Sequence, residues 1–242
     1  MAAGRAAHAS HEAHGRGKYL KSVVYGGLDG IITTFAVVAG VAGAHLDVAI
    51  VLILGFANLI ADGLSMALGD FLSTKAELQF AASEREREAW EVTHFPEQEK
   101  AELVEVYTEK GMAEADADAM VALLAGHEPT WVDTMMAMEL GIPESDESPL
   151  ANGTVTFLSF ATFGFVPLVA YVLTQLFSMQ GSPLALAAVL TGVTLFALGT
   201  VKVRVVRMHW LRAGIEMLVI GGVAAGAAYG IGAALATMLP AA

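Results

Sequence analysis

The sequence predicts an all-α integral membrane protein with five transmembrane helices and a helical insert between the second and third of them. The chain is 55% hydrophobic and has a mean hydropathy of +0.59, which is too apolar for an ordinary soluble domain. Apolar runs long enough to cross a bilayer can be read at about 20–44, 48–72, 151–178, 183–205 and 213–239. We therefore expect a tail at 1–17, two membrane helices in 18–73, an insert in 74–148 and three membrane helices in 149–242.

Residues 1–17 are rich in Ala, Gly and His, and His8, His11 and His14 lie three apart. This composition is typical of a tail without a packed core, and a weak auxiliary metal site is the alternative. In the first and fifth membrane helices, Gly26-xxx-Gly30 and Gly222-xxx-Gly226-xxx-Gly230 favour close helix contact and give weak support for oligomerisation.

The basic residues predict the orientation of the chain. All thirteen Lys and Arg residues fall before the first span, between the second and third, or between the fourth and fifth. By the positive-inside rule, the N-terminus and the insert face the cytoplasm. Because the number of spans is odd, the C-terminus lies outside.

The insert is strongly acidic. Residues 77–148 contain nineteen of the twenty-five acidic residues and only four basic ones, within a chain of net charge −12. Such a segment concentrates cations and is repelled by nucleic acid and by anionic lipid. The chain has no cysteine, which excludes disulfides and thiolate metal sites.

Four helices are expected around the insert. No Gly or Pro occurs from Phe71 to Val92, so the second membrane helix should continue into the insert and end near His94. Pro96 then begins a helix that stops near Gly111. Two more helices are expected at about 113–125 and 129–139, before a linker at 142–150.

Polar side chains lie within the first two membrane helices. Asp29 sits several residues inside an apolar span, where a carboxylate is costly and usually faces protein or a water-filled path; an interfacial Asp is the alternative. Asn58, Asp62, Met66 and Asp70 follow one another at intervals of four and form a stripe on the second helix. Helix packing would explain Asn58 and Met66 alone, but two aspartates on the stripe favour an ion pathway.

The insert carries a second set of candidate ligands. Glu84, Glu88 and Glu91 share one helical face, and Glu99, Glu102, Glu105 and Glu109 gather on the next helix. Like charges at these spacings repel one another unless a cation is bound. Met135, Met136 and Glu139 follow on the last helix of the insert; thioether sulfur favours transition metals. A solvated acidic face, with both methionines in the core of the insert, is the alternative.

Four motifs together resemble the vacuolar iron transporter (VIT) family: DGIITTFAVVAG in the first span, ADGLSMALGDFLS in the second, Glu-x2-Glu-x7-Glu-x2-Glu at 88–102, and MMAME at 135–139. The resemblance covers residues 18–240. It implies a homodimer of five-span subunits that exchanges Fe²⁺, often Mn²⁺ as well, for protons. It further implies a translocation path at the dimer interface and a cytoplasmic domain that binds metal.

The resemblance also assigns site residues. Asp29 and Met66 match the family's membrane pathway, to which the stripe adds Asp62. The cytoplasmic metal ligands match Glu88, Glu91, Glu99, Glu102, Met135, Met136 and Glu139. Asn58 stands where members can carry an acid, and Asp70 stands where Glu is frequent; these departures bear on proton stoichiometry and metal preference.

We therefore expect a transporter, not an enzyme, that exports Fe²⁺ from the cytoplasm in exchange for protons and has no prosthetic group. Mn²⁺, Zn²⁺ and Co²⁺ are further candidate ions. The expected partners are these ions, protons, membrane lipid and a second copy of the chain, without nucleic acid. The expected location is a prokaryotic inner membrane, or a vacuolar membrane in a eukaryote.

Two other functions remain open at this stage. One is a membrane-anchored di-iron carboxylate oxidase, because Glu91-Val-Thr-His94 matches one Glu-x-x-His motif, although such sites need two copies. The other is a metal sensor or buffer that does not transport.

Overall fold

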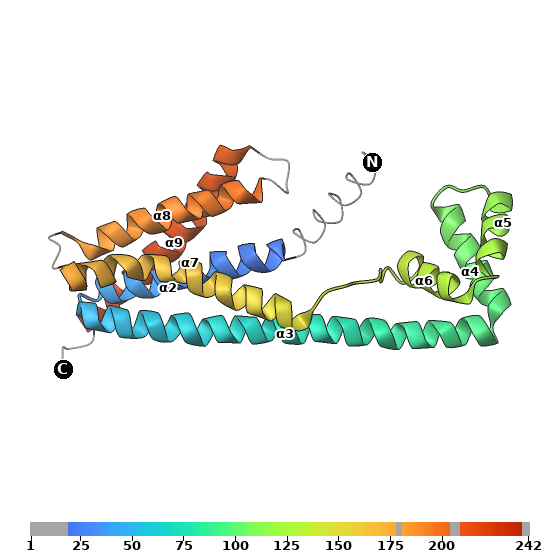
Figure 1. The fold of residues 1–242 in the computed structure, drawn as a ribbon. Helices are drawn as coiled ribbons and strands as arrows, with labels where there is room; N and C mark the ends of the chain where they lie inside the picture. Colours follow the sequence, from blue (N-terminus) through green and yellow to red (C-terminus); the bar gives the residue numbers. More distant parts are fainter. Residues whose placement is uncertain (1–18, 178–180, 204–208, 239–242) are drawn as a thin grey trace, which may run out of the picture. The chain divides into compact units, whose positions relative to one another are not determined.

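In the computed structural model, residues 19–177, 181–203 and 209–238 are described, and every secondary-structure element among them is a helix (Figure 1). The predicted tail at 1–17 lies outside the described residues. The chain divides into two compact units, one formed by residues 1–71 and 149–242 and the other by residues 72–148. We call them the membrane unit and the insert unit.

The membrane unit contains α2 (Leu20–Gly43), α7 (Pro149–Phe177), α8 (Pro183–Lys202), α9 (Trp210–Met238) and the first part of α3 (Val48–His94). Among the described residues, five helices are long and apolar enough to cross a membrane, and they are these five. The five predicted spans are thereby confirmed. The predicted bounds differ from the observed ones by up to three residues: α7 begins at Pro149, inside the predicted linker, and α9 begins at Trp210 instead of 213. Proline fits the first turn of a helix, which explains the start of α7.

α3 is a single helix of 47 residues. At 1.5 Å per residue it is about 70 Å long, more than twice the roughly 30 Å hydrocarbon core of a bilayer. Its second part therefore continues beyond the membrane-spanning length, as the absence of Gly and Pro predicted. α3 ends at His94; Phe95 follows, and α4 begins at Pro96.

Glycines allow α2 to approach α7 closely. A Cβ atom at Gly26 would lie 2.7 Å from the carbonyl oxygen of Thr156, and one at Gly30 would lie 2.4 Å from that of Phe160. Both distances are too short for a side chain, so the predicted contact of Gly26 and Gly30 forms within one chain. On α9, by contrast, a Cβ at Gly222, Gly226 or Gly230 would meet no described atom within 4 Å.

The core of the membrane unit lies where α2, α3 and α7 meet. Val38, Leu59, Phe160 and Leu168 are buried in one cluster, against which the partly buried Met66 packs. Dispersion and small-residue contacts of this kind hold membrane helices together, since lipid tails are as apolar as the side chains themselves.

The insert unit contains α4 (Pro96–Glu109), α5 (Glu114–Leu124), α6 (Glu128–Met138) and the last part of α3. These bounds confirm the predicted insert helices to within two residues. Leu103, Val121, Trp131 and Met135 are central members of a buried apolar cluster. An ion pair between Arg85 and Asp133 also joins α3 to α6.

Candidate metal-binding site

The insert unit brings five glutamates together in two groups of three. In the first, one carboxylate oxygen from each of Glu88, Glu91 and Glu99 lies within 4.8 Å of the others; Glu99, Glu102 and Glu139 form the second group in the same way. Glu99 belongs to both groups. The residues come from α3, from α4 and from the C-terminal end of α6. Five of the seven ligands predicted in the insert are thus near neighbours.

Glu88 is the most unusual member of these groups. Its side chain is buried, with 1% of the residue exposed, and its Oε1 atom has no hydrogen-bond partner. A buried carboxylate oxygen without a hydrogen-bond partner is costly unless the group is neutral or is paired with a cation. Burial, followed by the negative charges of Glu139 and Glu99, raises the pKa of Glu88 to about 8.

The neighbouring carboxyls respond in the same direction. Burial and then the charge of Glu102 raise the pKa values of both Glu99 and Glu139 above the ordinary value. Desolvation and crowding of like charges both penalise the ionised form. A divalent cation would reverse that penalty, and oxygen ligands suit hard divalent ions.

Met135 and Met136 are also in the insert unit, but the structure places them in its apolar core, with 0% and 5% of each residue exposed. The Met135 carbonyl accepts a hydrogen bond from the Glu139 N–H group at 3.0 Å, so the pair lies one turn from an acidic residue of the second group. Their burial agrees with the packing alternative. Their role as ligands stays a prediction.

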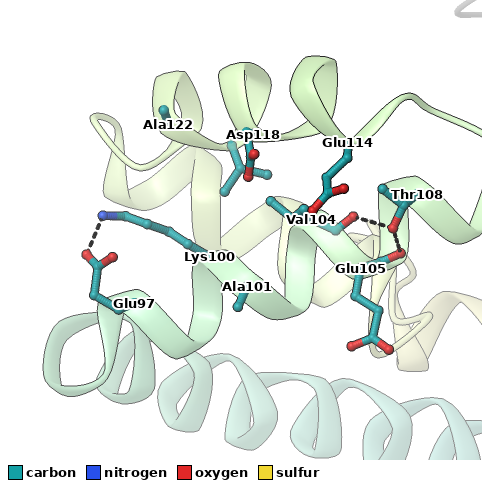
Figure 2. A pocket seen from close by; sticks show the side chains of 10 residues that line it. Glu97, Lys100, Ala101, Val104, Glu105, Thr108, Glu114, Asp118 and Ala122 are labelled. Carbon is teal, nitrogen blue, oxygen red and sulfur yellow. Dashed lines mark hydrogen bonds and ion pairs between the residues drawn. The ribbon is translucent and has the colours of Figure 1, made fainter.

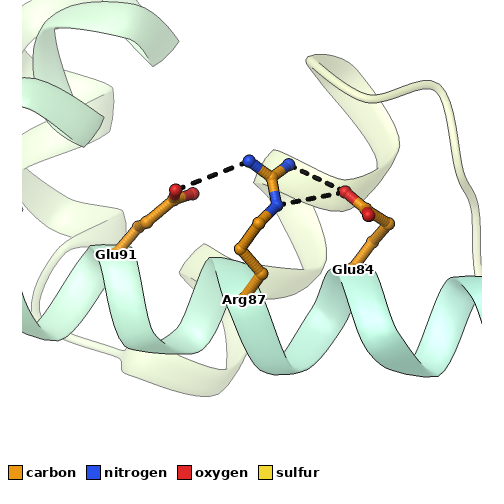
Figure 3. Close-up of polar contacts among 3 residues, drawn as sticks. All are labelled: Glu84, Arg87 and Glu91. Atoms are coloured by element: carbon orange, nitrogen blue, oxygen red, sulfur yellow. Dashed lines mark hydrogen bonds and ion pairs between the residues drawn. The ribbon is translucent and has the colours of Figure 1, made fainter.

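Arg87 is a residue that the sequence reasoning missed. Its Nε and Nη2 atoms donate to one carboxylate oxygen of Glu84 at 3.2 and 2.8 Å, and its Nη1 donates to Glu91 at 3.4 Å. Figure 3 shows the guanidinium between the two carboxylates on the same face of α3. The signal in the sequence was the spacing of three and four residues, at which opposite charges on a helix meet.

A separate cleft lies between α4 and α5 and has a volume of about 850 Å³. Its lining includes Glu105, Glu114 and Asp118, together with an ion pair between Lys100 and Glu97 at 2.8 Å (Figure 2). None of the seven predicted insert ligands lines this cleft. The cleft is therefore distinct from the two glutamate groups.

His94, the histidine of the single Glu-x-x-His motif, lies outside both glutamate groups. Its Nδ1 is 2.8 Å from the carbonyl oxygen of Trp90, and its ring stacks on the Trp90 indole. Glu91 and His94 thus do not converge on one site.

The membrane unit brings Asp29 and Asp62 within electrostatic range of each other, from α2 and α3. Both are partly buried, as is Met66, which packs against the core. Asn58 carries a buried Nδ2 atom without a hydrogen-bond partner. Among the described residues, no third acid or histidine joins Asp29 and Asp62 in a group that could hold a metal ion.

Asp70, the last member of the stripe on α3, is held by two hydroxyl groups. Ser22 of α2 and Thr156 of α7 donate to the same oxygen, Oδ2, at 3.0 and 2.5 Å. Both donors are buried. Asp70 therefore links three helices of the membrane unit, a role that its position in the sequence did not indicate.

Comparison with known proteins identifies the group to which the chain belongs. The model of the VIT family matches residues 20–233. A vacuolar iron transporter of Toxoplasma gondii is 40% identical over 224 residues, which are 90% of this chain and 74% of the relative. Vacuolar iron transporter 1 of Arabidopsis thaliana is 33% identical, over 88% of this chain and 84% of its own length. The family match and these relatives show that the chain is a member of the VIT family.

Proposed function

We propose that this protein is a secondary transporter that moves Fe²⁺ out of the cytoplasm in exchange for protons, with Mn²⁺ as a second candidate ion. The observation that carries the proposal is the crowded group of glutamates around the buried, unpartnered Oε1 atom of Glu88, in a chain whose relatives are named vacuolar iron transporters. Five apolar helices supply the membrane domain that a transporter needs.

In the proposed cycle, the insert unit faces the cytoplasm and its glutamates collect the ion, with Met135 and Met136 as further ligands. The ion then passes to Asp29, Asp62 and Met66 in the membrane unit. Protons from the far side neutralise the carboxylates and release the ion, because a neutral carboxyl is a poor ligand for a cation. Zn²⁺ and Co²⁺ are further ions that these ligand types accept.

We also propose that two copies of the chain form the transporter. The α9 glycines at 222, 226 and 230 are spaced for close helix contact, and Cβ atoms there would meet no described atom of the same chain within 4 Å. A second copy is the partner that would use this stripe. The prokaryotic inner membrane stays our proposed location, with the C-terminus outside.

The oxidase alternative is less well supported. A di-iron carboxylate site needs two Glu-x-x-His motifs facing a common centre, and His94 of the one motif considered lies outside both glutamate groups. A sensor or buffer would leave the partly buried Asp29 and Asp62 in the membrane unit without a role.

The proposal is tested with proteoliposomes that have an acidic lumen and enclose a dye quenched by Fe²⁺. We expect uptake of Fe²⁺ that stops when the pH gradient is collapsed and that is lost in Asp29→Ala. Asp47→Ala is the matched control, since Asp47 is an exposed acid in the connection between α2 and α3. Fe²⁺ uptake that does not depend on the pH gradient, or that continues in Asp29→Ala, would overturn the mechanism.

A further inference from the structure

Arg87 lies beside the glutamate groups and has two different carboxylate partners. Glu91 belongs to the first glutamate group, whereas Glu84 belongs to neither. The guanidinium donates twice to Glu84 and once, at the longer distance of 3.4 Å, to Glu91. Arg87 is thus anchored outside the candidate site and reaches into it with one N–H group (Figure 3).

The positive charge of Arg87 also acts on the rest of the site. It partly offsets the rise in the pKa values of Glu99 and Glu139 that burial and the neighbouring carboxylates cause. Arg87 is therefore a counter-charge for both glutamate groups. Near the same carboxylates it would repel an incoming cation.

The contact with Glu91 is suited to exchange. The Arg87 side chain is 48% exposed and that of Glu91 is 27% exposed, and ion pairs in such positions contribute little to stability. A divalent cation at the first group would take over the Glu91 carboxylate, while Arg87 keeps its two hydrogen bonds to Glu84. When the cation replaces Arg87 at Glu91, Arg87 then loses only one weak hydrogen bond.

We propose that Arg87 is a built-in competitor of the metal ion: it occupies Glu91 in the empty site, withdraws onto Glu84 when a divalent cation binds, and so sets the affinity of the site. This inference rests on the proposed metal-binding role of the glutamates. It assigns Glu84 a positioning role, because Glu84 holds the guanidinium that the ion displaces. An affinity lowered in this way would help the site to release its ion to a transport path.

The test is calorimetric titration of the full-length protein in detergent with Zn²⁺, which is redox-inert. Arg87→Gln is expected to bind Zn²⁺ roughly two- to tenfold more tightly than the wild type. This range corresponds to the free energy of one or two exposed ion pairs, which the ion no longer has to displace. Its affinity should also fall more steeply with salt, because the site has lost its internal counter-charge. Arg87→Lys should lie between the two, since it keeps the charge without the forked geometry.

Lys100→Gln is the matched control. It removes one positive charge next to Glu99 in the sequence, but Lys100 pairs with Glu97 and lines the separate cleft, so the Zn²⁺ affinity should stay near that of the wild type. If Lys100→Gln tightens binding as much as Arg87→Gln, the effect is one of net charge and the proposal is wrong.

A double-mutant cycle tests the role of Glu84. As a single substitution, Glu84→Gln should weaken Zn²⁺ binding, because Arg87 loses its hydrogen bonds to residue 84 and remains paired with Glu91. In the Arg87→Gln background most of that loss should disappear. Additive effects of the two substitutions would contradict the exchange.

Glu88→Gln separates this inference from the proposed site. If Glu88→Gln binds Zn²⁺ as the wild type does, the glutamate groups are not the metal site and the proposed role of the insert fails. If Glu88→Gln weakens binding while Arg87→Gln leaves it unchanged or weaker, the site stands and the role of Arg87 is overturned.

Discussion

Glu88 of α3 and Glu99 of α4 face each other: a carboxylate oxygen of each lies within 4.8 Å of the other and of one from Glu91. Glu99 has the same relationship to Glu102 and Glu139. If both groups bind an ion, Glu99 would be a ligand of each. Glu99 is the residue through which the two groups are coupled.

We predict that Glu99→Gln weakens metal binding at both groups, whereas Glu91→Gln and Glu102→Gln each weaken one. The amide keeps the shape of the side chain but removes the charge that a divalent ion needs. Metal content per chain, measured by elemental analysis after equilibrium dialysis against Zn²⁺ at a limiting concentration, should fall most in Glu99→Gln. Equal losses in all three variants would show that the groups are not joined through Glu99.

We predict that metal binding by the insert unit strengthens as the pH rises towards 8. Burial and the neighbouring carboxylates raise the pKa of Glu88 to about 8, so below this pH the group holds a proton that a metal ion must displace. With one proton released per ion, affinity should change by about tenfold per pH unit between pH 6 and 8 and level off above. Titrations with Mn²⁺, which resists hydrolysis across this range, measure the slope.

The control for this pH dependence is Glu88→Gln, which binds more weakly and should show a shallower slope. The slope should not vanish, because Glu99 and Glu139 also have raised pKa values. A slope as steep as that of the wild type would show that another group supplies the proton.

Much of this architecture could be predicted from the sequence because it follows from local patterns. Long apolar runs with few charged residues predict the five spans. The absence of Gly and Pro from Phe71 to Val92 predicts the continuous α3, and Pro96 predicts the start of α4. The site was predictable in part. Charged residues at repeated spacing indicate which glutamates share a helical face, but not which faces of different helices meet.

Two features that the motifs alone do not decide depend on packing between helices. The MMAME motif leaves open whether Met135 and Met136 are ligands or core residues, and the structure buries both in the core. The stripe on α3 suggests a pathway, yet Asp70 is held by hydroxyls of α2 and α7. Arg87, by contrast, contacts Glu84 and Glu91 three and four residues away on its own helix, a local spacing at which opposite charges meet.

We predict that Thr156→Val destabilises the membrane unit. The substitution keeps the shape of a buried side chain but removes a hydroxyl that donates to Asp70 at 2.5 Å. The loss should be about 1–3 kcal/mol, since the carboxylate then has one donor fewer in a buried setting. The apparent Tm in detergent, followed by intrinsic fluorescence, should fall by several degrees.

Thr154→Val is the matched control for this substitution. Thr154 is on the same helix, is exposed, and donates only to the carbonyl of Leu150 in its own helix, at 2.7 Å. Its Tm should stay close to that of the wild type. If both variants lose the same stability, the effect belongs to threonine in α7 and not to the link with Asp70.

We predict that Gly30→Ala disrupts the packing of α2 on α7, whereas Gly69→Ala is tolerated. A Cβ atom at Gly30 would lie 2.4 Å from the carbonyl oxygen of Phe160 and 2.9 Å from its Cα. These are backbone atoms that cannot rotate away, so the helices must separate, at a cost of about 1–3 kcal/mol or more. At Gly69, a Cβ meets no described atom within 4 Å, and alanine favours the helix. Size-exclusion chromatography and the Tm of both variants in detergent measure the difference. A Gly30→Ala protein as stable as the wild type would show that α2 and α7 do not pack this closely.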